Sequence, residues 1–449
     1  MFRSFRIFVW MFVCCTAIGR AQMQGMDMSM PAHGMDMATP STLMETIQQH
    51  TTSGTSVEPP STPKPMLMRR ADGWELMLHG NAFVADIQQH AASDRGGDKL
   101  FSTNWIMPMA QRRFGDGELT LRTMLSLEPA TITRRFYSEL FQQGETAYGR
   151  AIVDGQHPHD FVMELAGLYD VRVNEQTLFS LYVAPVGDPA IGPTAYPHRE
   201  SASEDPIAAL GHHQEDSTHI AFNVVTAGLT YRSVRLEASG FHGAEPDEER
   251  WRLQPSPNGV TPDSYSGRIT WAPRADLTAQ YSIAHLTGPE SLVPKDDETR
   301  QTASVMYNRP VGTHHDTKSM PGMDMVTPAT GNWSTTLLWG QAKSLPSNLV
   351  ANSYLIESLL RLRRNSYWTR IESAARTSEL LIPAPPVESV LGHVQAYTFG
   401  YDREFHAARH LLVAPGGQFT VYRAPDALGS SYGRTPFGAV MFVRLRIGE

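Results

Sequence analysis

The chain has 449 residues, a formal net charge of −8, 17 histidines and two cysteines. An acidic chain with no basic stripe is a poor nucleic-acid binder, so we expect no nucleic-acid partner. Both cysteines, Cys14 and Cys15, fall in the first 21 residues, which excludes disulfides, thiolate metal sites and cysteine nucleophiles from the rest of the chain.

The first segment has the layout of a secretory signal peptide. Arg3 and Arg6 precede an apolar run at 7–18, and small residues follow up to Ala21. We therefore predict that residues 1–21 are a signal peptide. The run is shorter than the roughly 20 residues that a membrane-spanning helix needs, and no later segment is more apolar, so a membrane role requires a β-barrel.

The next segment, residues 22–70, is rich in Met, Ser, Thr, Pro and Gln and has almost no aromatic residues. This composition predicts a disordered periplasmic tail. Two methionine-rich tracts lie in it, and clustered thioethers favour Cu(I) over harder ions. The candidate metal ligands of the tail are Met23, Met26, Met28, Met30, His33, Met35 and Met37.

From Trp74 onward, segments of about ten residues alternate in polarity, which is the signature of β-strands. In one of them, Leu119 and Leu121 alternate with Thr120 and Arg122. The charged face needs water or polar partners, which the lumen of a barrel supplies. We predict an all-β fold over residues 71–449, an antiparallel transmembrane β-barrel. A soluble β-sandwich is the alternative.

The connections between these strands support the barrel. We expect about sixteen strands, within a range of about fourteen to eighteen. Several joints are tight turns, whereas those at 130–159, 187–218 and 244–263 are long, and this asymmetry is typical of transmembrane barrels with short periplasmic turns. The predicted strands begin near residues 74, 101, 117, 160, 177, 219, 234, 264, 277, 299, 332, 353, 366, 393, 410 and 436. An even number of strands places both termini in the periplasm.

One joint on the short-turn side is long and carries a second methionine-rich tract. His314 and His315 come first, and Met320, Met323 and Met325 follow. The tail and this joint are then both periplasmic, which suggests that they serve one function. The histidine imidazoles beside the methionines are able to bind Cu(II) or Zn(II). A flexible linker in which methionine is incidental is the alternative.

Further histidines fall in the long loops or at the adjoining strand ends. These candidate metal ligands are His157, His159, His212, His213 and His219. Three interpretations stay open: a divalent metal site, a hydrogen-bonded network that rigidifies the loops, and a hydrolytic site. The chain has no G-x-S-x-G motif, and H-x-H-D lacks the helical spacing of metalloproteases.

The tail residues from Met23 to Met37 resemble the methionine-rich segment of the bacterial copper-resistance outer-membrane protein B family. The resemblance covers this tail and the general architecture, and it implies an outer-membrane barrel that acts in periplasmic copper resistance. The remainder resembles the broad porin class.

We therefore expect a non-enzymatic protein of the bacterial outer membrane that binds or handles copper at its periplasmic methionine-rich segments, with no organic cofactor. Ions or small solutes passing through the barrel are compatible with this role. The expected partners are the lipid bilayer, a metal ion or small solute, a periplasmic copper protein, and further copies of the chain. A porin without a metal role and an outer-membrane hydrolase are the alternatives.

Overall fold

The computed structural model describes residues 39–216, 221–253, 261–312, 315–316, 325–326, 330–345, 347–385 and 387–448, and of the two short central pieces it describes the backbone alone. The predicted signal peptide therefore lies outside the described residues.

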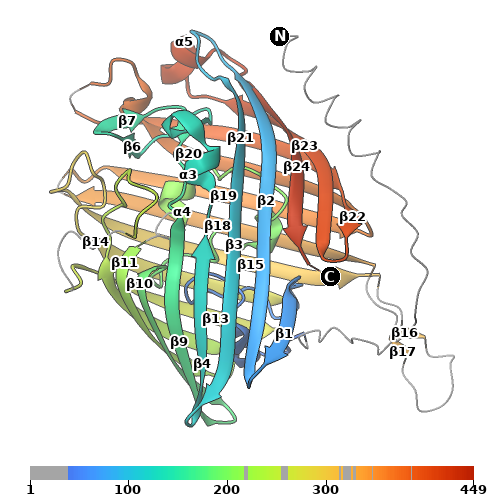
Figure 1. Ribbon diagram of the computed structural model, residues 1–449. Coiled ribbons are helices and arrows are strands. Elements are labelled where there is room, and N and C mark those ends of the chain that lie inside the picture. The colour runs from blue at the N-terminus through green and yellow to red at the C-terminus, as the bar shows by residue number, and fades with distance from the viewer. Residues whose placement is uncertain are drawn as a thin grey trace. The chain divides into compact units, whose positions relative to one another are not determined.

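Sixteen strands form a closed antiparallel barrel within the described part of the chain (Figure 1). Each wall strand pairs with the next one along the chain, and β24 closes the ring on β2, with Ile447 opposite Gly80. The predicted barrel is confirmed, and each strand begins within about three residues of its predicted start. The wall strands are β2 (Trp74–His90), β3 (Asp98–Phe114), β4 (Gly117–Leu125), β9 (Val162–Asn174), β10 (Thr177–Gly187), β11 (Ala221–Tyr231), β12 (Val234–His242), β13 (Ser264–Arg274), β14 (Leu277–Leu286), β15 (Asp297–Val311), β18 (Gly331–Leu345), β19 (Val350–Leu362), β20 (Asn365–Thr377), β21 (Val390–Arg403), β23 (Leu411–Arg423) and β24 (Phe437–Ile447).

Short elements complete the fold. The strand β1 (Leu67–Ala71) pairs with the first residues of β2, and β22 (Phe405–Ala408) pairs with the first residues of β23. The other short strands are β5 (Tyr137–Ser138), β6 (Glu145–Ala147), β7 (Arg150–Ile152), β8 (Gly155–Gln156), β16 (His315–Asp316) and β17 (Met325–Val326). The helices are α2 (Leu43–Gln49), α3 (Glu128–Thr131), α4 (His212–Glu215) and α5 (Gly429–Tyr432), with 3-10 turns η1 (Thr133–Arg135), η2 (Glu200–Ala202), η4 (Ser378–Leu380) and η5 (Asp426–Leu428). Among the described residues, no helix is long and apolar enough to cross a membrane.

The two ends of the barrel differ as expected. One end carries the tight turns between β3 and β4, β9 and β10, β11 and β12, β13 and β14, and β19 and β20. The connections at 126–161, 188–220 and 243–263 lie at the opposite end. The joint between β15 and β18 is the long exception at the short-turn end, and its β16 and β17 pair with His315 opposite Val326.

The two faces of the wall also follow the predicted alternation. Leu236 of β12 and Ile269 of β13 are directly paired and exposed on the outer face. The next pair, Glu237 and Arg268, is buried on the inner face and joined by an ion pair of 2.8 Å. The wall is thus apolar outside and charged inside.

Residues 39–66, which we call the plug segment, lie in the barrel lumen. Its helix α2 begins with a capping box, in which Thr42 accepts from the Glu45 amide and the Glu45 carboxylate accepts from the Thr42 amide. Leu43 and Ile47 of the helix are buried together with Leu178 of the wall. Burial of this apolar face fixes the helix against the short-turn half of the lumen.

Ion pairs and hydrogen bonds from the wall hold the rest of the plug segment. Arg122 donates to the carbonyl oxygens of His50 (2.9 Å) and Gly54 (2.6 Å) and pairs with Glu164 at 2.7 Å. His50 contacts Asp170 at 2.6 Å. The prediction of a disordered tail over 22–70 is therefore wrong for residues 39–70, because small polar residues that cannot build a core of their own find partners on a charged lumenal wall.

The long connection after β10 also enters the lumen, and we call its described part, residues 188–216, the inner loop. Arg199 pairs with Glu357 of β19 at 2.5 Å, and Asp205 pairs with Arg370 of β20 at 3.0 Å. The inner loop meets the plug segment where the Glu200 amide donates to Glu58 at 2.7 Å. The plug segment and the inner loop thus both lie in the lumen and contact each other there.

Candidate metal centre in the lumen

Six buried methionines gather on one side of the lumen. One comes from the plug segment and five come from the wall strands β2, β3, β4 and β9. None of the six is more than 8% exposed. We call them the lumenal methionine cluster: Met66, Met77, Met107, Met109, Met124 and Met163. Thioether sulfur is a soft ligand, so a cluster of this kind is suited to Cu(I) and similar soft cations.

The register of the wall brings these side chains together. Met77 of β2 is directly opposite Met109 of β3, and the neighbouring inward pair is His79 opposite Met107. Leu125 of β4 pairs with Ile106 of β3, which places Met124 beside Met107. Because every second residue of a strand points inward, Met77, Met107, Met109 and Met124 face the lumen. Met163 joins them at a register shift between β4 and β9, where Met124 pairs with Glu164 and Leu125 pairs with Val162.

Two histidines border the cluster. His198 of the inner loop has its Nε2 3.3 Å from the Met124 sulfur, and its ring centroid lies 4.2 Å from that of Trp105. His79 is 8% exposed, and its Nε2 has no hydrogen-bond partner among the described residues. The His79 ring makes an edge contact with Trp105 at 5.0 Å between centroids.

The His79 nitrogen is a candidate ligand beside the thioethers. Methionine often fills gaps in apolar cores, so packing alone would explain the thioethers. A buried polar atom without a protein partner is satisfied by a water or an ion, and the described residues include other such atoms, His242 Nε2 among them. The 3.3 Å between His198 Nε2 and Met124 Sδ is close to the roughly 3.5 Å expected between a nitrogen and a sulfur ligand on one tetrahedral ion.

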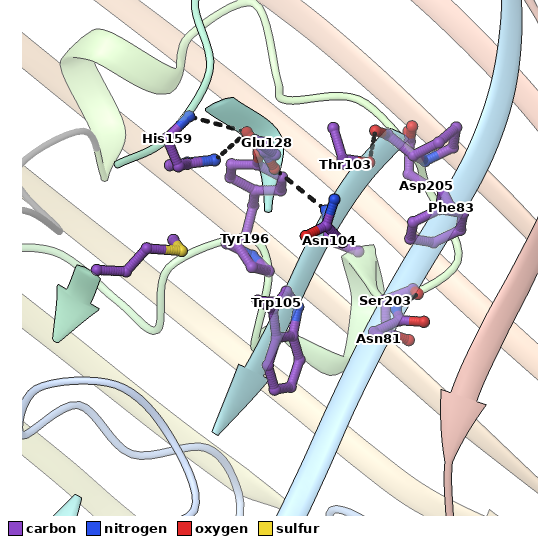
Figure 2. A pocket seen from close by; sticks show the side chains of 14 residues that line it. Asn81, Phe83, Thr103, Asn104, Trp105, Glu128, His159, Tyr196, Ser203 and Asp205 are labelled. Carbon is purple, nitrogen blue, oxygen red and sulfur yellow. Dashed lines mark hydrogen bonds and ion pairs between the residues drawn. The ribbon is translucent and has the colours of Figure 1, made fainter. Parts of the chain in front are cut away.

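A small cavity lies next to the cluster (Figure 2). Met163 and Trp105 line it together with Glu128, His159 and Tyr196. Its volume of about 30 Å³ exceeds the roughly 10–15 Å³ that one water needs. The space therefore accepts a water or an ion.

The loop histidines are each placed beside a carboxylate. Glu128 accepts from the backbone amide of His159 at 2.8 Å and contacts its Nδ1 at 2.8 Å, as Figure 2 shows. Its other oxygen accepts from the Asn104 amide at 3.2 Å, which ties the loop to β3. His212 contacts Asp216 at 2.5 Å. These contacts are those of a network that fixes loop conformation.

His157 and His213 share Glu145. The His213 Nε2 lies 3.0 Å from one Glu145 oxygen, and the backbone amide of His157 donates to the other at 2.7 Å. Burial raises the pKa of Glu145 to about 7 and lowers the pKa of His213 to about 4. His213 is therefore a neutral imidazole near pH 7, the form that can ligate a metal.

The remaining predicted ligands are not placed by side chain. Met23, Met26, Met28, Met30, His33, Met35, Met37, His219, His314, Met320 and Met323 lie outside the described residues, and of His315 and Met325 only the backbone is described.

The sequence analysis missed the lumenal methionine cluster, although a signal for it exists. Met124 lies on the same face of its strand as Thr120 and Arg122, and Met107 and Met109 lie on the same face as Gln111. These positions belong to the polar face, so a methionine there departs from the alternation. Only the closed barrel shows that these methionines, which lie on separate strands, come together in space.

No protein-family model and no curated protein sequence matches the chain. Solved structures with a similar arrangement include an anion-selective porin from Comamonas acidovorans, with 11% identity, a TM-score of 0.49, and coverage of 83% of this chain and 100% of that one. Salmonella typhi OmpF in complex with daunomycin has 9% identity, a TM-score of 0.49 and coverage of 85% and 100%. Pseudomonas putida OprB has 9% identity, a TM-score of 0.49 and coverage of 84% and 94%. At these values the likenesses carry no argument about function, and the barrel fold rests on the strand pairings above.

Proposed function

We propose that the protein is an outer-membrane β-barrel that binds Cu(I) in its lumen and serves copper handling or resistance. The outer-membrane location is supported by the apolar outer face, on which Leu236 and Ile269 are 55% and 44% exposed, and by the short turns at one end and long loops at the other. The observation that carries the copper role is the lumenal methionine cluster with the unpaired Nε2 of His79.

The proposed orientation puts the short turns in the periplasm. The plug segment reaches this end, because the Ser61 amide donates to the carbonyl of Ala275 in the β13–β14 turn. The tail residues from Met23 to Met37 precede the plug segment in the chain, and Met66 at its end belongs to the cluster. Along the sequence, the methionines of the tail are thus followed by Met66 of the cluster, and a periplasmic copper protein is the proposed exchange partner of the tail.

Porin-like passage of small solutes is the second candidate function. It is favoured by the closed barrel with its charged inner wall. The plug segment and the inner loop must then move, since both are bonded to that wall. Hydrolysis has no observation of its own in its favour, because a histidine beside a carboxylate, as in the His159–Glu128 and His212–Asp216 pairs, occurs in structural networks and in hydrolases alike.

An anaerobic Cu(I) titration against a competing chromophoric chelator tests the copper role. It compares the folded protein with a variant lacking residues 22–37 and with a variant in which the wall methionines are changed to leucine: Met77, Met107, Met109, Met124 and Met163. The matched control is Met306→Leu, since Met306 is a buried methionine of β15 outside the cluster.

We expect the truncated protein and the Met306→Leu control to retain one tight site that the wall variant loses. Equal affinity in the wall variant and the control would contradict a lumenal centre. Loss of all binding on removal of residues 22–37 would confine copper to the tail.

A further inference from the structure

Four connections at the long-loop end bring metal-ligating side chains to one place. The ligand atoms of His213, Glu245 and Glu290 all lie within 4.8 Å of one another. Glu145 joins them, with one oxygen 3.0 Å from His213 Nε2. The four residues come from β6, from α4, from the connection after β12 and from the connection after β14, so four segments distant in sequence converge there.

Contacts outside the proposed ligand atoms also hold the segments that carry Glu145, Glu245 and Glu290. The backbone amide of Glu245 donates to the carbonyl of Pro289 at 3.1 Å, which joins the two connections that carry Glu245 and Glu290. The Thr146 and Ser291 hydroxyls are 2.6 Å apart, which ties β6 to the same place. The position of each carboxylate is therefore set by its backbone.

Acidic groups gather at this place. Glu145 is fully buried and Glu245 and Glu290 are half-buried, so a charge on any one of them is poorly screened from the others. The neighbouring Arg250 and Arg300 are themselves paired with Asp160 and Glu298, at 2.9 and 2.7 Å. A bound cation would offset the repulsion between ionised carboxylates.

We propose that His213, Glu245 and Glu290, with Glu145, bind a divalent cation of the zinc type. One imidazole nitrogen with carboxylate oxygens is a ligand set of Zn²⁺, which binds such atoms at about 2.0 to 2.2 Å. Ligands on one tetrahedral ion are then about 3.3 Å apart, so small side-chain movements from the observed separations close the site. This site goes beyond the copper proposal, because its ligands are nitrogen and oxygen and it lies on other elements.

The bound ion would join four loops at one point. It would hold α4, and with it the inner loop, to the connections after β12 and β14. We therefore expect the ion to protect the long-loop end from proteolysis while leaving the wall unchanged.

The test is a competition titration of the EDTA-treated, detergent-folded full chain with Zn²⁺ and a chromophoric chelator. The variants are Glu245→Gln and Glu290→Gln, which remove a charge and keep the side-chain shape. The matched control is Glu249→Gln, an exposed glutamate of the same connection as Glu245 whose contact is an ion pair with Arg252. Ag⁺ binding and the heat-dependent gel shift of each variant report on whether the barrel is folded.

We expect one site that both variants weaken by about tenfold or more and the control leaves unchanged. Zn²⁺ should also slow cleavage of the long loops in the wild type and the control, but not in the two variants. Equal Zn²⁺ affinity in all folded proteins would place the ion elsewhere, and absence of binding would mean that the carboxylates are neutralised by protons; either result overturns the proposal.

Discussion

Met77 and Met109 lie directly opposite each other across the β2–β3 pair, and both side chains are buried on the inner face of the wall. The adjacent inward pair is His79 and Met107. Two successive cross-strand pairs therefore present three thioethers and one imidazole to the same part of the lumen. Cross-strand partners lie about 5 Å apart at Cβ, close enough for long side chains to meet at one ion.

The cluster should tolerate loss of sulfur better than loss of volume. We expect Met109→Leu to change the free energy of unfolding by less than about 1.5 kcal/mol, because leucine conserves the volume. Met109→Ala should cost about 2 to 5 kcal/mol, because it leaves a cavity. Urea unfolding in detergent micelles measures both values. If leucine were as costly as alanine, the sulfur itself would be structural in the metal-free protein.

Arg122 should control whether the plug segment stays in the lumen. Arg122→Ala removes its bonds to the His50 and Gly54 carbonyls and leaves the buried Glu164 without its cation. The Gly54 amide and the Tyr182 hydroxyl still donate to that carboxylate, and the expected cost is about 3 to 5 kcal/mol. We expect higher single-channel conductance in planar bilayers and faster proteolysis of residues 39–66. Arg274→Ala, at the exposed end of β13, is the control. Unchanged conductance with a demonstrably released plug segment would argue against passage through the lumen.

The outer face should behave as a lipid-facing surface. Ile269→Arg places a charge at the middle of β13 and should destabilise the inserted barrel by about 2 to 4 kcal/mol. Val173→Arg, beside the tight turn after β9, should cost about 0 to 1 kcal/mol. Folding titrations into lipid vesicles compare the two variants. Equal costs at the two depths would count against a membrane-spanning wall.

The raised pKa of Glu379, at the long-loop end, predicts that the stability of the fold depends on pH. Burial raises its pKa from the usual 4.5 to about 7, and repulsion from Glu388 adds to the shift. Between these values the folded chain holds a proton that the unfolded chain has lost. The stability contributed by Glu379 is therefore complete below about 4.5 and disappears as the pH rises through 7.

The thermal unfolding temperature of the wild type should fall more steeply between pH 5 and 8 than that of Glu379→Gln. Parallel pH profiles for the two proteins would show that the proton on Glu379 has no effect on stability.

The barrel could be predicted because its signals are local and repeated. The alternation of Leu119 and Leu121 with Thr120 and Arg122 needs no knowledge of distant residues, and the tight turns fix where each strand ends. The same reasoning failed for the plug segment. Its composition resembles a disordered tail, and the partners that order it, such as Arg122 and Asp170, are on the distant wall.

The candidate metal sites could be predicted from the sequence only in part. Met107, Met109 and Met124 depart from polar strand faces, which is visible in the sequence, but Met163 has the alternation of the exposed Leu165. The contact of Met124 with His198 also depends on the inner loop entering the lumen. The convergence of Glu245 and Glu290 with His213 likewise follows from barrel closure and loop packing. Residue type and position on the strand face therefore suggest candidate metal ligands, and only the fold shows which of them lie together.

The most direct test of the lumenal centre is copper K-edge X-ray absorption on Cu(I)-loaded protein lacking residues 22–37, with Met320, Met323 and Met325 changed to leucine. The account predicts a copper ion bound by thioether sulfur with at least one imidazole nitrogen, and loss of the nitrogen scattering in the same protein carrying His79→Phe and His198→Phe. A spectrum without sulfur ligands, or one unaffected by changing Met77, Met107, Met109, Met124 and Met163 to leucine, would contradict it.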